Sequence, residues 1–166
     1  GDIGMMSLAG QLKIVDRKKN LVKLKGGEYV ALEMMNIAYN NADIINVDAG
    51  GVCAFADHDI DRPVVFAQCK AKELTELAAE AGVTGKEGTE LCRDPKVMAA
   101  VKAKLDPAAK AAKLPALMHA IAVMPVLEPW TAQNGCLTAT SKLVPKAVFK
   151  LHAEDLKVLK SLATKG

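Results

Sequence analysis

Aromatic side chains and net charge are both scarce in this chain of 166 residues. Phe, Trp and Tyr make up only 4% of the sequence, so few rings could stack on bases, which argues against a single-stranded nucleic-acid binder. The formal net charge is only +3, which by itself selects no class of partner. With so few rings, the core must consist mainly of Leu, Ile, Val, Met and Ala.

Long apolar runs and metal-binding patterns are also missing. The sequence has neither a signal peptide nor 18 consecutive apolar residues, so we expect a protein that is not secreted and is cytoplasmic or associated with an organelle membrane. None of the four cysteines has a Cys-x-x-Cys partner or a histidine at ligand spacing, which argues against zinc and favours buried thiols. The Asp-x-Asp-x-Asp run at 57–61 lacks the glycine and the distal glutamate of a calcium loop, so we expect no metal site here.

Hydrophobic periodicity predicts a chain of mixed strands and helices. Helical spacing is clear at 72–81, before Gly82, and again after Asp94-Pro95, which has the form of an N-cap followed by a first-turn proline; we expect Asp106-Pro107 to interrupt this second helix. Residues 31–40 predict a helix with Met34, Ile37 and Ala38 on one side, and another helix begins at Pro145. Strands are predicted at 11–17, 20–25, 44–47, 52–56, 63–71 and 119–124, and a loop at 128–137.

These elements predict an α+β fold. The first two strands, joined by a polar turn at 18–20, would form an N-terminal β-hairpin after a linker at 1–9. The remaining strands would form a small mixed sheet flanked by helices. At this length one domain can bury a sizeable core without disulfides.

A basic segment at 16–25 is the first candidate for function. Arg17 offers a planar fork of donors suited to phosphates and hydroxyls, and the lysines around it add charge. On a strand, Lys23 and Lys25 would share the face opposite Val22 and Leu24. Spacing alone favours a simpler interpretation, which is an edge hairpin that its lysines protect from aggregation.

Two further segments could contact a ligand. The paired Gly26 and Gly27 would let a narrow substrate approach the main chain, although a plain turn is the better interpretation from spacing alone. Lys142 ends a run of small hydroxyl residues before the last helix and could reach into a separate site as a phosphate partner, although an ordinary exposed lysine is more common.

The same segments carry a family resemblance. Gly-Asp-Ile-Gly at 1–4, Gly-x-Leu-x-Ile-Val-Asp-Arg-Lys-Lys-x-Leu-Val-Lys-Leu at 10–24 and Gly-Glu-Tyr-Val-x-Leu-Glu at 27–33 resemble the hinge region of long-chain fatty acyl-CoA synthetases, which are AMP-forming members of the adenylate-forming superfamily. Asn-Gly-x-Leu-Thr-x-Thr-x-Lys-Leu at 134–143 is similar to a second motif of that family.

The resemblance implies a domain organisation. Residues 1–17 would be a linker and first hairpin strand leading into a hinge, and residues 18–166 would be a mobile C-terminal domain. The partner would be the large N-terminal domain of the same enzyme, absent here, and the substrates would be a fatty acid, ATP and CoA. Mg²⁺ would be held mainly by that N-terminal domain, so we expect this fragment to be inactive alone.

The resemblance also implies roles for individual residues. Asp2 and Arg17 match residues that hold the ribose of ATP, and Lys19 lies at the pivot of the hinge. Lys142 matches the catalytic lysine of adenylate formation, and Gly26, with Gly27, matches the loop along the CoA path. Because the two half-reactions would need different lids, we expect Lys142 and Gly26 on different faces, neither of them buried.

Departures from the family pattern occur near these residues. Asn20 stands where family members often carry an Asp. Val144 and Pro145 stand where basic residues usually follow the lysine, and Lys146 and Lys150 would be the cations that replace those basic residues. These changes leave open how the loop of Lys142 is anchored.

Three alternatives remain. Another adenylate-forming acyl ligase would share these motifs, because acyl length is set in the absent domain. A non-enzymatic basic module would bind nucleic acid with a steep salt dependence, but the few aromatics and small charge favour no nucleic-acid partner. The third alternative is a membrane-surface adaptor, since residues 13–25 are basic, although alternating lysines on strands do not make an amphipathic helix; the ligase domain itself could also associate peripherally with a membrane.

Overall fold

This computed structural model describes residues 2–6, 10, 12–17 and 21–164. At its centre is a three-stranded mixed sheet of β5 (Val52–Phe55), β6 (Val64–Gln68) and β7 (Ala122–Val126), in the order β5-β6-β7. β5 and β6 are antiparallel, whereas β6 and β7 are parallel. Every residue of β6 and β7 is buried, as expected for strands covered on both faces. The predicted α+β fold with a small mixed sheet is confirmed.

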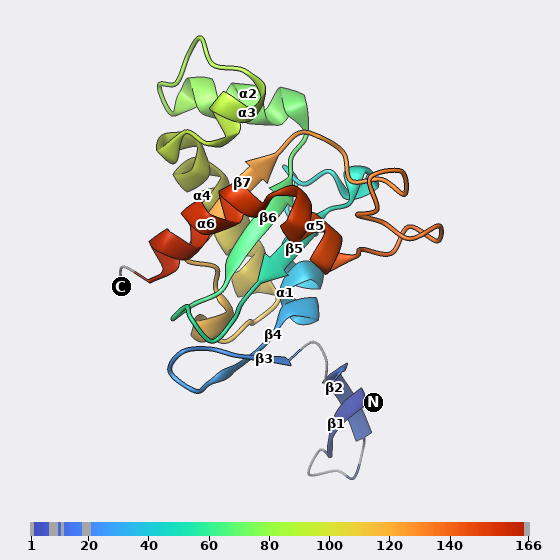
Figure 1. Cartoon of the computed structure of the whole chain (residues 1–166). Helices are drawn as coiled ribbons and strands as arrows, with labels where there is room; N and C mark the ends of the chain where they lie inside the picture. Colours follow the sequence, from blue (N-terminus) through green and yellow to red (C-terminus); the bar gives the residue numbers. More distant parts are fainter. Residues whose placement is uncertain (1, 7–9, 11, 18–20, 165–166) are drawn as a thin grey trace.

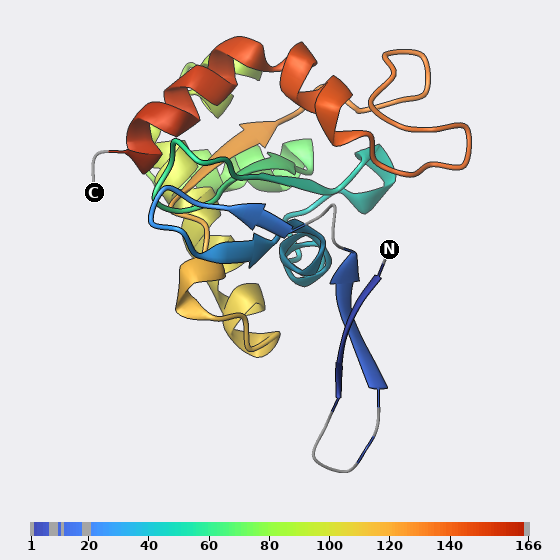
Figure 2. The same ribbon diagram turned by 60° about the horizontal axis from the view of Figure 1, so that its bottom comes forward.

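Helices cover both faces of this sheet. The connection from β6 to the parallel β7 contains α2 (Ala71–Glu80), α3 (Gly88–Cys92) and α4 (Pro95–Ala111), because parallel neighbours need a long crossover. Figure 2 shows α5 (Pro145–Leu151) and α6 (Ala153–Ala163) on one side of the sheet and α1 (Leu32–Tyr39) with α4 on the other. A 3-10 turn, Ala116–Met118, lies between α4 and β7.

The two best-patterned helices form as predicted, but α4 runs further. The Asp94 carboxylate accepts a hydrogen bond from the Lys96 amide at 2.8 Å, and Pro95 occupies the first turn. We expected the helix to break at Asp106-Pro107, and that prediction is wrong. The buried column Val97, Val101, Leu105 and Ala109 continues past the proline, so packing against the core outweighs the one backbone hydrogen bond that proline removes.

The N-terminal hairpin prediction is wrong in its pairing. The strand at 12–17 (β2, Leu12–Arg17) pairs with β1 (Asp2–Met6), in the segment we interpreted as a linker. The next strand (β3, Leu21–Lys23) pairs with β4 (Tyr29–Ala31) across a turn that contains Gly26 and Gly27. There are therefore two hairpins, and in Figures 1 and 2 the β1–β2 hairpin projects away from the rest of the chain. The predicted turn at 18–20 lies outside the described residues.

Helix α1 forms where expected and buries Ala38 as predicted, but its core face is centred on Met35 and Tyr39 rather than on Ile37. Met35, Ala38 and Tyr39 are in the core, while Ile37 is 62% exposed. The Tyr39 hydroxyl accepts a hydrogen bond from the Ala120 amide at 2.8 Å, and this bond fixes the rotation of the helix.

Two further predictions need correction. Residues 44–47 form no strand; Ile45 makes one isolated bridge with Cys69, and a 3-10 turn, Val47–Ala49, follows. The C-terminal helix is divided at His152 into α5 and α6, because the backbone of His152 (φ −104°, ψ 34°) leaves the helical region.

Candidate functional site

Lys142 lies at the tip of the loop between β7 and α5, and residues 130–144 are here called the Lys142 loop. The Thr138 amide donates to the Lys142 carbonyl at 2.8 Å, and the Lys142 amide donates to the Thr138 hydroxyl at 3.1 Å. Ser141 closes the turn in the left-handed region (φ 58°). The tip is therefore a tight, internally bonded turn that leaves Lys142 exposed.

Asn134 organises the base of the Lys142 loop. Its side-chain oxygen accepts hydrogen bonds from the amides of Thr131 (2.9 Å) and Cys136 (3.2 Å), and its amide group donates to the Pro129 carbonyl at 3.0 Å. One side chain thus satisfies several backbone groups that would otherwise have no partner in a loop.

The departures after Lys142 have a structural role. The Val144 amide donates to the Cys136 carbonyl at 2.8 Å, and Pro145 is the first residue of α5, where a missing amide is harmless. The loop is therefore anchored without the basic residues that usually follow this lysine in the family. Lys146 and Lys150 on α5 are both exposed.

Trp130 joins the Lys142 loop to the body of the domain. Its ring is 1% exposed, and its Nε1 donates to Nε2 of His152 at 3.0 Å. Its backbone amide donates to the Ala49 carbonyl at 3.0 Å. A Cβ on Gly50 would lie 2.8 Å from Cε3 of Trp130, so the ring packs directly on the backbone of that residue.

His152 sits between the loop, the sheet and α6. Its ring stacks on Phe66 of β6 with centroids 5.4 Å apart, and its Nδ1 lies 3.9 Å from a carboxylate oxygen of Asp155. Burial lowers the pKa of the His152 imidazole, and the charges of Asp155 and Glu128 oppose that shift. Asp155 is itself bound by Arg93 at 2.6 Å.

The glycine pair lies in the β3–β4 turn. The Leu24 amide donates to the Glu28 carbonyl at 2.8 Å, and the Lys25 amide donates to the Ile60 carbonyl at 3.1 Å. Leu24 is buried, whereas Lys25 and Gly26 are exposed and Gly27 (φ 94°) is half-buried. The turn is thus pinned to the body, and only its tip presents bare main chain to solvent.

Lys142 and Gly26 belong to segments at opposite ends of the domain. Figures 1 and 2 both show the β3–β4 turn far from the loop that precedes α5. Both residues are exposed, as we predicted. One surface of this domain therefore cannot present both groups to the same small site at once.

The two predicted ribose contacts are neighbours on the first hairpin. Asp2 and Arg17 are directly opposite in the register of β1 and β2, so their backbones lie side by side at one end of the hairpin. Lys19, the predicted pivot, lies outside the described residues.

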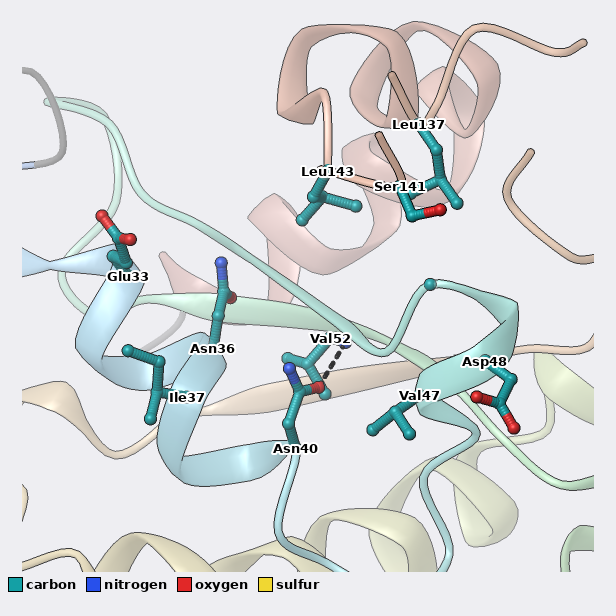
Figure 3. Close-up of a pocket in the computed structure, with 11 residues that line it drawn as sticks. Glu33, Asn36, Ile37, Asn40, Val47, Asp48, Val52, Leu137, Ser141 and Leu143 are labelled. Carbon is teal, nitrogen blue, oxygen red and sulfur yellow. Dashed lines mark hydrogen bonds between the residues drawn. The ribbon is translucent and has the colours of Figure 1, made fainter. Parts of the chain in front are cut away.

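A pocket of about 480 Å³ lies beside the Lys142 loop, between that loop and α1 (Figure 3). Leu137, Ser141 and Leu143 line one side, and Asn36 and Asn40 of α1 lie opposite. The Asn40 oxygen accepts from the Val52 amide at 2.9 Å and the Asn36 oxygen from the Ala54 amide at 2.7 Å, so both amide groups are engaged with the edge of β5.

The cysteines and acidic residues offer no reactive centre in the described part of the chain. All four thiols are buried, and burial raises the pKa of Cys69 to about 12 and of Cys92 to about 11, so these thiols stay protonated near neutral pH. No group of three or more His, Cys, Asp or Glu residues is placed to hold a metal ion among the described residues. The predicted buried, apolar role of the cysteines is confirmed.

Sequence reasoning missed Trp130 and His152. The sequence places them 22 positions apart in segments interpreted as a loop and a helix, so no spacing rule connects them. The single tryptophan of the chain, next to a proline in a loop, was the available signal.

The curated relatives of this chain are long-chain acyl-CoA synthetases. The chain is 38% identical over 156 residues to long chain acyl-CoA synthetase 6, peroxisomal, of Arabidopsis thaliana, and 32% identical over 154 residues to long-chain-fatty-acid–CoA ligase 1 of Saccharomyces cerevisiae. These matches cover 94% and 90% of this chain but only 22% and 21% of the relatives, so the chain spans about a fifth of their length. No protein-family model matches the chain.

Solved structures with the same fold are adenylation domains. The carboxylic acid reductase A domain of Segniliparus rugosus, in complex with AMP and a carboxylic acid, matches 97% of this chain with a TM-score of 0.73 at 22% identity. The corresponding domain from Mycobacterium chelonae matches 97% with a TM-score of 0.75 at 20% identity. This chain covers 23% and 22% of those two chains.

Proposed function

Because this chain belongs to the long-chain acyl-CoA synthetase family, we propose that it is the mobile C-terminal domain of an AMP-forming fatty acid–CoA ligase. The strongest support is that the exposed Lys142 and the exposed Gly26 turn lie at opposite ends of the domain. The N-terminal domain of the same enzyme is the proposed partner, and a hinge at Lys19, after residues 1–17, would let residues 18–166 turn against it.

The proposed reaction has two steps with different electrostatic demands. In the first, a carboxylate oxygen of the fatty acid attacks the α-phosphate of ATP, and the bond to pyrophosphate breaks. In the second, the CoA thiol loses its proton and attacks the acyl carbonyl, and AMP leaves. The first step concentrates negative charge on oxygens, and the second requires room for a thiol arm.

Lys142 suits the first step. The internally bonded tip would carry its ammonium to the carboxylate and phosphate, where a positive charge stabilises the transition state. No described residue forms an ion pair with Lys142, so its charge would remain available for substrate. The Gly26 turn suits the second step, because bare main chain leaves space for the pantetheine arm where a side chain would fill it.

The nucleotide and metal would be held largely outside this fragment. Asp2 and Arg17, paired on the first hairpin, would contact the ribose of ATP. We propose that Mg²⁺ is held mainly by the N-terminal domain, as the family resemblance implies. None of the helices among the described residues is long and apolar enough to cross a membrane. A cytoplasmic or organelle-membrane location, with peripheral membrane association, remains a prediction.

The test restores the N-terminal domain and measures the half-reactions separately. Lys142→Ala should lower adenylate formation by about 100-fold or more, the usual effect of removing one stabilising donor, and should largely spare thioester formation from supplied acyl-adenylate. Lys110→Ala, at an exposed lysine on α4, is the matched control and should change neither.

Gly26→Leu should give the reciprocal result. The added side chain would obstruct the thiol arm and lower thioester formation, while adenylate formation persists. Equal loss of both half-reactions in either variant would contradict the proposal. Turnover of ATP, CoA and palmitate by the 166 residues alone would contradict the assignment of the remaining machinery to the absent domain.

A further inference from the structure

The Lys142 loop contacts the body through the residues on both sides of its tip, where Leu137 and Leu143 pack partly buried against the core. Its tip is held by bonds within the loop, so those bonds set its shape but not its direction. Direction comes from the base, where the Trp130 amide donates to Ala49 and the buried Cys136 packs in the core.

The Trp130 side chain adds a cross-link at this base. Its indole donates to Nε2 of His152 at 3.0 Å, although the two residues are 22 positions apart. The segment between them contains all of the Lys142 loop and all of α5. This hydrogen bond therefore joins the two ends of the segment that carries Lys142. The stacking of His152 on Phe66 in turn connects these ends to the central strand β6.

The bond depends on the protonation state of His152. A neutral imidazole with its proton on Nδ1 accepts at Nε2, whereas the doubly protonated ring has no acceptor. The charged groups that face the ring are Asp155 on α6, Glu128 after β7 and Arg93 before α4. The two carboxylates favour the cation and Arg93 opposes it, but burial dominates and keeps the ring neutral near neutral pH.

We propose that Trp130 and His152 are positioning residues for adenylate formation, and that their hydrogen bond holds the Lys142 loop in the direction that delivers the lysine. This inference rests on the proposed role of Lys142. Neither residue is placed in contact with substrate, and the β3–β4 turn lies at the other end of the domain, so the effect should be confined to the first half-reaction.

The test uses the enzyme with its N-terminal domain and reports the ratio of the two half-reaction rates. Trp130→Phe removes the donor together with part of the buried ring, and should lower adenylate formation by about fivefold or more, of which about fivefold is the effect of one buried hydrogen bond, with thioester formation changed less than about twofold. His152→Ala should act alike. His152→Gln places an uncharged acceptor near the position of Nε2 and should restore the ratio.

A pH profile separates positioning from simple packing. In the wild-type enzyme the ratio should be maintained at about pH 6.5, the ordinary histidine value, and should fall only at lower pH, because burial lowers the pKa of His152 and protonation removes the acceptor. In His152→Gln this dependence should disappear. His58→Gln, at a histidine whose side chain is 83% exposed, is the matched control and should keep the wild-type profile.

The outcomes distinguish this inference from the proposed function. Misfolding would lower both half-reactions together, so a ratio unchanged in Trp130→Phe and His152→Ala would overturn the positioning role. A profile in His152→Gln identical to wild type would also overturn it. If Lys142→Ala itself spares adenylate formation, the proposed function fails, whatever the Trp130 and His152 variants do.

Discussion

Gly50 is the residue on which the base of the Lys142 loop rests, and replacing it with alanine should destabilise the domain in two ways. Its φ of +118° lies outside the regions that L-residues favour, which costs about 1–3 kcal/mol for a residue with a side chain. The new Cβ would also lie 2.8 Å from Cε3 of Trp130 and 3.1 Å from its Cβ. Overpacking of a buried site costs about 1–3 kcal/mol more.

Gly82→Ala separates these two terms. Gly82 ends α2 at φ +74°, and a Cβ there would meet nothing within 4 Å, so only the backbone term of about 1–2 kcal/mol applies. We therefore expect Gly50→Ala to lose about 1–3 kcal/mol more unfolding free energy than Gly82→Ala, from the overpacking term. With a urea m-value of about 2 kcal/mol/M, this is an additional midpoint shift of about 0.5–1.5 M.

Urea unfolding followed by fluorescence measures both effects at the relevant place, because Trp130 is the only tryptophan of the chain. In native Gly50→Ala the emission should shift to the red as the displaced ring meets water, whereas Gly82→Ala should keep the wild-type emission. Equal midpoints for the two variants, with unchanged native emission in Gly50→Ala, would show that the ring does not rest on Gly50 and would refute the packing described here.

Three further predictions concern the core and its titration. The four buried thiols should resist a water-soluble thiol reagent at pH 8 and react together on unfolding, because each has a raised pKa; rapid labelling of the native chain would contradict this. Leu105→Ala should lower the unfolding free energy by about 2–5 kcal/mol, since its side chain is fully buried. Leu162→Ala, at an exposed side chain on α6, should cost far less. Similar losses of the two variants in denaturant unfolding would disprove this. Because the folded state lowers the pKa of His152, the unfolded chain binds more protons, so stability should be full above about pH 6.5 and fall as the pH drops, by at most about 1.4 kcal/mol per pH unit; His152→Gln should flatten that part of the stability profile, and an equal slope in both proteins would count against it.

Local signals made the crossover helices predictable. Asp94 caps α4 with its carboxylate, Pro95 occupies the first turn, and Gly82 follows α2 in the left-handed region, so neighbouring residues suffice to place these boundaries. The continuation of α4 past Pro107 depends on burial of Ala109, which is a property of the folded core.

Pairing and rotation were not predictable in the same way. Alternating residues identify a strand but do not name its partner, so β2 was paired with β3 rather than with β1. Met34, Ile37 and Ala38 have helical spacing, but so do Met35, Ala38 and Tyr39. The fold buries the second set, and the Tyr39 hydroxyl there accepts from the Ala120 amide, 81 positions away.

Some residues of the candidate site could be found from short motifs, whereas others depend on the fold. Lys142 and Gly26 could be named from short motifs, and their exposure follows from polar, small neighbours. The hydrogen bond between Trp130 and His152 depends on how the chain folds back over the sheet, which no local pattern encodes.

The side chains of Asn36 and Asn40 protect the outer edge of β5 from pairing with another chain. β5 is an outer strand of the sheet, and its Val52 and Ala54 amides point away from β6. Without other acceptors, such amides could pair with a strand of another chain. Two side-chain oxygens from one helix already occupy those donors. In the motion that we propose for this domain, the outer edge of β5 could therefore meet other molecules without pairing with a strand of a second copy.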